Sequence, residues 1–373
     1  MGVTRPSSPS MKATGRAPST GATATILDVA RRAGVSTATV SRALAAPDRV
    51  AEETRAKVIA AIAATGYTPN ASARSLRSRS TSIVLALVPG MSNTFFTPIL
   101  NAIEDVLSAA GYGLIIGDTR GSPQKESHYT RFIRAGQVDG VILFTGHLPR
   151  DGGITPDSER VPIALVCNEI SGDDRYSVFD VDNRDAARRA TVHLIEAGHR
   201  RIGHIAGAPD NIEASERLKG FRDGLAEAGL AVDEAAIWSG GFRFDNGIDA
   251  ARRFLALRRR PTAVFAAADD AAIGFIRTVR DAGVRTPEDV SIVGFADIDY
   301  ASVLEPPLTT MRQPRVELGR LAAEDLLARM GRDTPHFPPR SARLRCELIE
   351  RGSVWRIGPQ RARSRSRGAG RES

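Results

Sequence analysis

The residues that decide the fold of this chain run from Thr25 to Leu44: T-I-L-D-V-A-R-R-A-G-V-S-T-A-T-V-S-R-A-L. Their apolar members recur at helical spacing in two short runs, and Gly34–Val35 between the runs is typical of a tight turn. Thr25 with Asp28 three positions later predicts a capping box for the first helix, and Ser36 predicts the N-cap of the second. This pattern predicts a helix-turn-helix unit. Its expected apolar positions are Val29, Ala30, Ala33, Val40, Ala43 and Leu44.

The second of these helices has an unusual outer face. Thr37, Ala38, Ser41 and Arg42 occupy positions where an ordinary surface helix carries several charges. A small and lightly charged helix face can enter the major groove of DNA. We therefore expect this helix to be a DNA recognition helix.

A third helix is expected over Glu53–Thr65, because Val58, Ile59 and Ile62 recur at helical spacing and Gly66 follows as a stop signal. Together the three helices make a small core. The alternative interpretation is a plain helical bundle with no nucleic-acid role.

The next segment, residues 67–80, is Y-T-P-N-A-S-A-R-S-L-R-S-R-S. Pro69 prevents the third helix from continuing, and Asn70 is a good cap for another short helix. The segment is basic. Apart from its alanines, Leu76 is the one apolar residue within 70–80. Taken alone, it could equally be a solvated linker.

Two motifs in this region resemble the lactose/galactose repressor family of bacterial transcription regulators. Asp28–Arg42 matches the family's D-V-A-x-x-A-G-V-S-x-x-T-V-S-R, and Pro69–Leu76 matches its hinge motif P-N-x-x-A-R-x-L, almost letter for letter. The resemblance implies that the second helix contacts base edges and that the hinge helices of two subunits pair in the minor groove. A leucine wedge there bends the DNA and recovers the unstacking cost through new contacts.

Carried onto this chain, the resemblance assigns base contacts to Thr37, Ala38 and Arg42. Arg42 is the side chain here that can make a bidentate contact to guanine, whereas the two short residues fit a thymine methyl or another groove edge. Leu76 takes the role of the wedge, and Ala73 permits close approach. Phosphate contacts fall to Ser36, Thr39 and Ser41, and Asn70 and Arg74 complete the implied DNA-binding set.

The charge of the chain is unevenly distributed. Residues 1–79 carry a net charge of +8 and residues 361–373 carry +4, which leaves −4 for the rest because the whole chain carries +8. A basic head on a mildly acidic body suits a protein whose head contacts phosphate groups and whose body does not. The basic tail is expected to be disordered, with added non-specific nucleic-acid affinity as the alternative.

Composition excludes several other classes of protein. No apolar run approaches the length of a membrane span and no signal-peptide core is present, so we expect a cytoplasmic protein that contacts no membrane. Cys167 and Cys346 lie in apolar runs without metal-ligand spacing and are expected to be core residues. We find no catalytic motif, so the sequence predicts no catalytic residues, no cofactor and no metal site.

From Ser82 onward, strand patterns alternate with helix patterns, which predicts parallel sheet. Two doubly wound parallel-sheet lobes are more plausible than one very wide sheet. The expected strands are 82–88, 113–118, 138–144, 161–167, 201–206, 262–267, 290–295 and 344–350. The expected helical segments are 96–110, 124–135, 184–197, 215–228, 245–257, 269–282 and 316–330.

This body resembles the periplasmic-binding-protein-like core that the same family carries, from about Ser82 to Ser353. The resemblance rests on H-L-I-E-A-G-H-R-R-I-G (193–203), R-L-K-G-F-R-D-G-L (217–225) and S-I-V-G-F-A-D-I-D-Y-A-S (291–302). The run P-I-A-L-V-C-N-E (162–169) is closer to the cytidine-responsive branch of the family than to the galactoside-responsive one.

The resemblance implies an effector site between the lobes, at the carboxyl ends of the strands. Arg217 offers a fixed fork of donors, and its alternative role is an ion pair. The aromatic candidates could instead be plain core, and Asp269 could be only a helix cap. The candidates are Asn93, Phe95, Phe96, Arg217, Phe242, Asp269 and Asp297.

One departure from the family pattern concerns the kind of effector. Sugar-responsive relatives often have a polar pair where this chain has Ala268 and Ala296. A desolvated sugar hydroxyl without a partner costs about 1–3 kcal/mol. The sequence therefore disfavours a typical hexose, unless Asp297 compensates, and favours a flatter, less hydroxylated ligand such as a nucleoside.

The resulting hypothesis is a homodimeric repressor that binds a pseudo-palindromic double-stranded operator and responds to a nucleoside or sugar-like effector. The alternatives are a DNA-binding regulator without a small-molecule ligand and a solute-binding protein. The expected divisions are a disordered extension (1–22), a helix-turn-helix domain (23–69), a hinge helix and linker (70–80), a two-lobed effector-binding and dimerisation domain (81–355) and a basic disordered tail (356–373).

Overall fold

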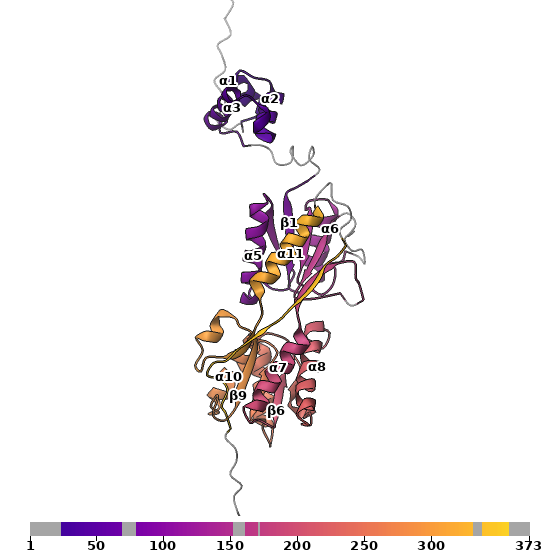
Figure 1. Cartoon of the computed structure of the whole chain (residues 1–373), viewed down its shortest axis with the longest axis vertical. Coiled ribbons are helices and arrows are strands. Elements are labelled where there is room, and N and C mark those ends of the chain that lie inside the picture. Colours follow the sequence, from indigo (N-terminus) through magenta and orange to yellow (C-terminus); the bar gives the residue numbers. More distant parts are fainter. Residues whose placement is uncertain (1–23, 69–79, 152–160, 171, 331–337, 358–373) are drawn as a thin grey trace, which may run out of the picture. The chain divides into compact units, whose positions relative to one another are not determined.

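The chain forms two compact units, Met1–Arg79 and Ser80–Ser373, in this computed structural model. The structure describes residues 24–68, 80–151, 161–170, 172–330 and 338–357. The expected extension, the hinge positions 70–79 and the tail from residue 358 lie outside the described residues. We call the first unit the head and the second the body, and describe each by itself (Figure 1).

The described part of the head, residues 24–68, contains the three helices that the sequence predicts and one short 3-10 turn that it does not. The carboxylate of Asp28 accepts hydrogen bonds from the Thr25 N–H (2.9 Å) and hydroxyl (2.7 Å), so it closes the start of the first helix. Ser36 Oγ accepts from the Thr39 N–H at 3.1 Å and caps the second. Gly34 ends the first helix with a φ of 70°. The elements are α1 (Ile26–Ala33), α2 (Thr37–Ala45), η1 (Pro47–Arg49) and α3 (Glu52–Thr65).

Two of the expected core positions of the head are wrong. Ile59 is 59% exposed and Leu44 is 39% exposed, whereas Ala61 is buried. Successive helix residues are turned by about 100°, so Ile59 cannot share the inward face of its neighbour Val58. The observed core consists of Val29, Ala30, Val40, Ala43, Val58 and Ala61, with Ile62 and Ala33 packed at its edge.

The first lobe of the body is built on a six-stranded sheet in the order β11-β5-β4-β3-β1-β2, with every neighbouring pair parallel. Helices α5, α6 and α11 belong to this lobe (Figure 1). Its strands are β1 (Ile83–Val88), β2 (Gly113–Asp118), β3 (Gly140–Leu143), β4 (Ile163–Val166), β5 (Ser177–Val181) and β11 (Ser341–Leu344). Its helices are η2 (Thr94–Phe96), α5 (Thr97–Ala109), α6 (Pro123–Arg134) and α11 (Arg315–Met330).

The second lobe has a sheet in the order β12-β10-β9-β8-β6-β7, parallel except for the β10–β12 pair. Its strands are β6 (Ile202–Ile205), β7 (Ile237–Trp238), β8 (Ala263–Ala266), β9 (Ser291–Ala296), β10 (Thr309–Arg312) and β12 (Glu347–Ile349). Its helices are α7 (Asn183–Glu196), α8 (Ile212–Glu227), α9 (Phe244–Ala256) and α10 (Asp269–Asp281), with the 3-10 turns η3 (Glu234–Ala236) and η4 (Asp299–Ser302).

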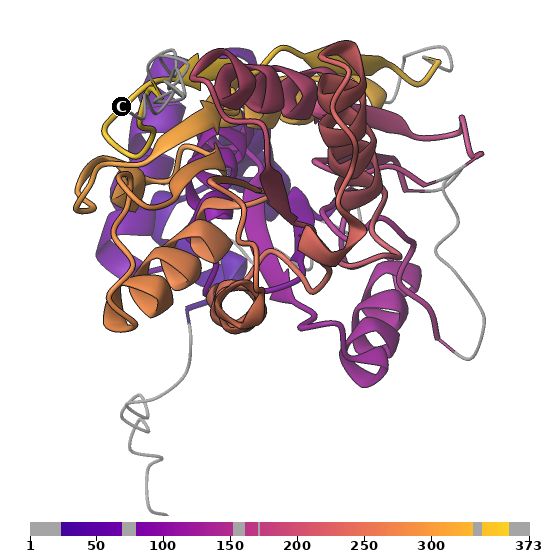
Figure 2. The same cartoon turned by 90° about the horizontal axis from the view of Figure 1, so that it is seen from below.

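Helices cover both faces of the second sheet, which is why its strands read as nearly continuous apolar runs. Along β8, Ala263 and Phe265 join a core with α7 and α8, whereas Val264 and Ala266 join a core with α9 and α10. Figure 2 shows the two helix pairs on opposite sides of this sheet. The expected two-lobed, doubly wound body is confirmed. Among the described residues, every helix is too short or too polar to cross a bilayer.

The strand expected over 344–350 is wrong as a single element. Leu344 ends β11 in the first sheet and Glu347 begins β12 in the second, with buried Cys346 between them. One continuous strand cannot belong to two separate sheets, so the chain breaks its pairing where it passes from one lobe to the other. The periodicity also fails to predict β5 and the two-residue β7, because β5 carries a charged residue near its end and β7 is too short to show alternation.

Candidate functional site

The outer face of α2 is accessible in the head. Ser36, Ala38 and Arg42 are exposed, whereas Thr37, Thr39 and Ser41 are half-buried. The Thr39 hydroxyl lies 2.9 Å from Ser36 Oγ. The Arg42 side chain forms no ion pair or hydrogen bond with the described residues of the head, so its guanidinium is available to a ligand. Of the implied DNA-binding residues, Asn70, Ala73, Arg74 and Leu76 lie outside the described residues.

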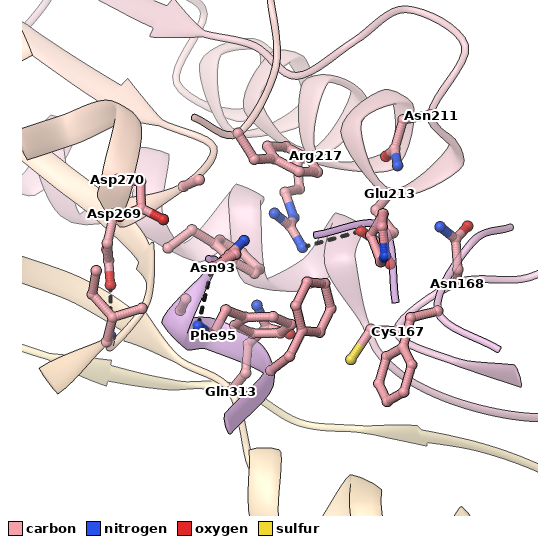
Figure 3. A pocket seen from close by; sticks show the side chains of 18 residues that line it. Asn93, Phe95, Cys167, Asn168, Asn211, Glu213, Arg217, Asp269, Asp270 and Gln313 are labelled. Carbon is pink, nitrogen blue, oxygen red and sulfur yellow. Dashed lines mark hydrogen bonds and ion pairs between the residues drawn. The ribbon is translucent and has the colours of Figure 1, made fainter. Parts of the chain in front are cut away.

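The body contains a pocket where the carboxyl ends of strands from both lobes meet. Its volume is about 110 Å³. Open α/β sheets bind ligands at this edge. Figure 3 shows Arg217 and Glu213 entering the pocket from α8, while Asn93 and Phe95 enter from the first lobe. The lining includes six of the seven expected residues, namely Asn93, Phe95, Phe96, Arg217, Phe242 and Asp269.

Arg217 is only 5% exposed, and its side chain is fixed in place by several contacts. Its Nε donates to Asn183 Oδ1 (2.8 Å) and its Nη1 donates to the Ala267 carbonyl (2.7 Å). The guanidinium carbon lies 3.9 Å from the Phe295 ring centroid and 4.8 Å from that of Phe242. Such cation–π contacts strengthen when they are desolvated. Arg217 is therefore held in one orientation at the pocket wall.

Glu213 stands one helical turn before Arg217 and is almost fully buried. Its Oε2 lies 3.8 Å from Arg217 Nη2, whereas Oε1 has no hydrogen-bond partner among the described residues. Burial first, and then the nearby Asp180 carboxylate, raise the pKa of Glu213 to about 8. At neutral pH the side chain is therefore mostly protonated, and it can both donate and accept a hydrogen bond.

Asn183 links this group to the first lobe. Its side-chain amide donates to Asp180 Oδ2 (3.0 Å) near the end of β5 while its carbonyl oxygen accepts from Arg217. Burial raises the pKa of Asp180 to about 6, against the opposing effect of the Val181 N–H bond. A polar chain of Asp180, Asn183 and Arg217 thus runs from the first lobe into the pocket.

The first-lobe wall of the pocket is aromatic. Phe96 makes edge-to-face contacts with Phe95 (5.2 Å between centroids) and Phe144 (5.3 Å). Asn93 Oδ1 accepts from the Phe95 N–H at 2.9 Å, which fixes the start of η2 and leaves its amide group for other partners. This wall offers ring faces and edges to a ligand.

Asp269 is not the cap of α10, because the N-cap position is Ala268. Its carboxylate accepts from the Ile298 N–H (2.9 Å) and from the Thr310 hydroxyl (2.6 Å), so it ties α10 to the segment that follows β9 and to β10. Burial raises its pKa to about 6. Both oxygens already have partners within the protein.

The structure places Asp297 outside the pocket lining. Its backbone φ is 57°, and its carboxylate pairs with Arg312 (2.7 Å) and Arg351 (2.7 Å). The left-handed backbone turns the side chain toward this arginine pair. Ala268 and Ala296, the two alanines that the sequence takes as evidence against a hexose effector, both line the pocket.

Sequence reasoning missed several polar lining residues. Asn211 caps α8 by accepting from the Ala214 N–H at 2.7 Å, and Gln313 is 4% exposed directly after β10. Asn211 could have been found as an N-cap residue before a predicted helix. Gln313 could have been found as a polar residue that directly follows a strand. Cys167 is buried, and burial raises the pKa of its thiol well above the usual range, so it stays protonated. The missed lining residues are Pro89, Phe144, Cys167, Asn168, Asn211, Glu213, Asp270, Phe295, Ile298 and Gln313.

A helix-turn-helix head and a two-lobed body with a pocket between its lobes define a ligand-responsive DNA-binding protein. Comparisons with known proteins agree. Residues 25–70 match "Bacterial regulatory proteins, lacI family" and residues 191–354 match "Periplasmic binding protein-like domain". The HTH-type transcriptional repressor CytR of Escherichia coli is 38% identical over 331 residues, covering 89% of this chain and 96% of that repressor. The HTH-type transcriptional repressor PurR of Photobacterium profundum is 36% identical over 332 residues, covering 89% and 98%.

Solved structures give the same result. The transcriptional regulator CelR–cellobiose complex is 33% identical with a TM-score of 0.68, covering 88% of this chain and 99% of that one. The lac repressor dimer bound to operator and the anti-inducer ONPF is 25% identical with a TM-score of 0.77, covering 90% and 100%. This chain belongs to the lacI family of bacterial regulatory proteins. It is a DNA-binding transcriptional regulator of the kind that small-molecule effectors control.

Proposed function

We propose that this regulator is a homodimeric repressor whose effector is a flat, lightly hydroxylated ring compound of the nucleoside class, bound in the pocket between the lobes. The observation that carries the proposal is Arg217, which is buried at the pocket wall with its guanidinium over the rings of Phe242 and Phe295. A planar guanidinium flanked by aromatic rings favours a planar ligand that carries hydrogen-bond acceptors.

The polar groups of the pocket support the same class of ligand. Glu213 Oε1 is buried without a partner among the described residues, and Asp270 is half-buried at the opposite end of the lining (Figure 3). A buried polar atom that stays unpaired costs about 1–3 kcal/mol, so a ligand that satisfies Glu213 gains that amount. Ring nitrogens and exocyclic amino groups supply such partners.

The two alanines argue against a hexose. Ala268 and Ala296 line the pocket and present no side-chain acceptor. Each sugar hydroxyl buried against them loses its water partner without replacement. One relative of known structure, CelR, is a complex with cellobiose, so sugars belong in the test beside nucleosides.

For the head, we propose that Arg42 and its neighbours on α2 contact base edges, with Ser36, Thr39 and Ser41 on phosphates. One recognition helix covers only a few base pairs, so specificity requires two heads on a pseudo-palindromic operator. Leu76 and the other hinge residues keep the DNA-bending role that the motif implies. The relatives with the most similar sequences reported above are transcriptional repressors, and on that ground we propose a cytoplasmic regulator without catalytic activity.

The test is calorimetric titration of the full chain with cytidine, adenosine, hypoxanthine, ribose and cellobiose. We expect binding of a nucleoside or nucleobase, and loss of that binding in Phe242→Ala. Phe244→Ala is the matched control, because Phe244 is 42% exposed and does not line the pocket. Binding of cellobiose alone overturns the assignment of ligand class. A complete absence of binding favours a regulator without a small-molecule ligand.

A further inference from the structure

One polar atom in the wall of the effector pocket lacks a partner within the protein. Glu213 is 8% exposed, and its Oε1 is buried with no hydrogen-bond partner among the described residues. Trp238 Nε1 and Thr286 Oγ1 are unpaired as well, but neither residue lines the pocket. Of the described side chains with a buried, unpaired polar atom, Glu213 is therefore the one that a ligand in the pocket can reach.

The charges buried around Glu213 do not balance if every group is ionised. Asp180, on β5, acts on Glu213 through its charge, and both carboxylates face the guanidinium of Arg217. Arg343 also acts on Asp180, but its side chain is 59% exposed and is paired with Glu169. Burying an uncompensated charge is costly, and a like charge nearby adds to the cost. A proton on one of the two carboxylates removes this imbalance.

Arg217 does not remove the imbalance by bonding to Glu213. Its Nη2 lies 3.8 Å from Glu213 Oε2, which is beyond hydrogen-bond distance. Its Nε and Nη1 donate instead to Asn183 and to the Ala267 carbonyl. The guanidinium is thus engaged with neutral acceptors, and Glu213 is left without a strong ionic bond.

The other described groups beside Glu213 in the pocket wall are uncharged. Cys167 is a thiol whose pKa is raised well above its usual range, mainly by burial. Asn168 and Asn211 are neutral amides, and Figure 3 shows them beyond Glu213 on the side away from Arg217. Burial is the main cause that raises the pKa of Glu213 to about 8. At neutral pH the acid therefore keeps its proton, and Oε1 can carry that proton as a donor.

We propose that Glu213 is the residue that selects the effector: it carries a proton before the effector arrives, and its Oε1–H donates a hydrogen bond to an acceptor atom on the effector ring. The inference rests on the proposed function and adds to it that binding requires this proton. Cytosine and adenine rings offer such an acceptor in an unprotonated ring nitrogen. An ionised carboxylate can only accept hydrogen bonds, so it repels the lone pair of that nitrogen. Effector binding is therefore expected to respond to pH.

The first test is calorimetric titration of the full chain with cytidine and with adenosine, from about pH 6.5 to about pH 9.5. Neither nucleoside gains or loses a proton in this range. We expect the dissociation constant to rise by about tenfold for each pH unit above the pKa of Glu213. Titrations in buffers with different heats of ionisation give the number of protons taken up on binding. That number should approach about one for each nucleoside bound at the alkaline end.

Two replacements of Glu213 separate donation from titration. Glu213→Gln keeps a donor and an acceptor but cannot titrate, so it should bind the nucleoside within about fivefold of the wild type, without pH dependence or proton uptake. Glu213→Leu has neither group and should bind at least about tenfold more weakly at neutral pH. The control is Glu216→Gln on the same helix, because Glu216 pairs with Lys219 at 2.6 Å and does not line the pocket. This control should behave as the wild type does.

Asp180→Asn tests the cause of the proton's retention. Removing this neighbouring charge should let Glu213 ionise more easily, so the loss of affinity should begin closer to neutrality. A merely structural role of Glu213 does not produce such a displacement. Asp270, whose pKa is also raised by burial, is the rival source of a proton in the pocket. Proton uptake that persists in Glu213→Gln but disappears in Asp270→Asn overturns the proposal.

The outcomes separate this inference from the proposed function. Nucleoside binding with constant affinity and no proton uptake overturns the role of Glu213 and leaves the ligand class standing. Affinity that falls equally in the wild type and in Glu213→Gln as the pH rises indicates titration elsewhere and contradicts the inference. An absence of nucleoside binding at every pH overturns both.

Discussion

Arg217 lies over the ring of Phe295, with 3.9 Å between its guanidinium carbon and the ring centroid. The same guanidinium donates to the Ala267 carbonyl at 2.7 Å and to Asn183 at 2.8 Å. A side chain anchored in this way is oriented before any ligand arrives, so binding does not have to immobilise it. The second-lobe wall of the pocket is therefore preorganised, because Arg217 is already held in one orientation.

Replacing Arg217 with Met is expected to abolish effector binding and to lower the free energy of unfolding of the body by about 1–3 kcal/mol. The loss follows because Asn183 Oδ1 and the Ala267 carbonyl lose their donor in a buried site. Urea unfolding and calorimetry measure the two effects. The control is Arg222→Met, also on α8, whose side chain is 46% exposed and pairs with Glu234. A stable variant that still binds the effector contradicts the role given to Arg217.

Glu213 is expected to make the body less stable as pH rises above neutrality. Its pKa is about 8 in the folded chain against an ordinary value of 4.5, so the folded state holds a proton that the unfolded state has released. The stabilisation is fully present below about pH 4.5 and is lost as pH rises through about 8. The slope is at most about 1.4 kcal/mol per pH unit.

The measurement is urea unfolding across the range from just below neutrality to the pKa of Glu213. Asp180 and Asp269 titrate near pH 6, and burial lowers the pKa of His204 to about 4, so these groups act mainly below this window. Glu213→Gln should flatten the profile, whereas the exposed Glu234→Gln should not. A wild-type profile that is already flat across this window counts against a protonated Glu213.

Removing the Asp269 carboxylate is expected to destabilise the body. Asp269→Ala leaves the Ile298 N–H and the Thr310 hydroxyl without their acceptor, at a cost of about 1–3 kcal/mol. The carboxylate of its neighbour Asp270 has no hydrogen-bond partner among the described residues, so Asp270→Ala is the matched control and should change stability little. Denaturant midpoints compare the two. Similar losses in both variants contradict the bracing role.

Arg42→Ala is expected to relax base preference at one position of each operator half-site. A bidentate contact to guanine is worth about 1–3 kcal/mol of discrimination. Selection of binding sites from random duplexes measures the preference, with Arg49→Ala, an exposed arginine of η1, as the control. Weaker binding with unchanged base preference instead indicates that Arg42 contacts phosphate.

Local signals made most of the helices and strands predictable. Ser36 caps α2 and Gly34 ends α1 through bonds within a few residues, so their roles are visible in the sequence. The strands of both sheets are buried on two faces and appear as apolar runs. Ile59 was mispredicted because helical spacing alone does not say which of two adjacent apolar residues faces the core.

The pocket residues that belong to a family motif were predictable from the sequence. The partners that folding brings next to them were not. Arg217 follows from the resemblance, but its partner Asn183 stands at the start of another helix and its stacking ring, Phe295, lies near the end of a strand. Glu213 appears in the sequence as an ordinary helix carboxylate. Contacts between distant segments bury Glu213. They also pair the Asp297 carboxylate with Arg312 and Arg351, so that it does not line the pocket.

The sequence by itself determined that this chain has a helix-turn-helix head, a two-lobed α/β body and membership of a family of transcription regulators, because caps, periodicity and motifs are local. Only the tertiary structure decided which polar side chains lose water together in the pocket, and that Arg201 lines the same surface hollow as Arg258 and Arg259. Desolvation and charge repulsion depend on proximity in space, which no spacing along the chain encodes.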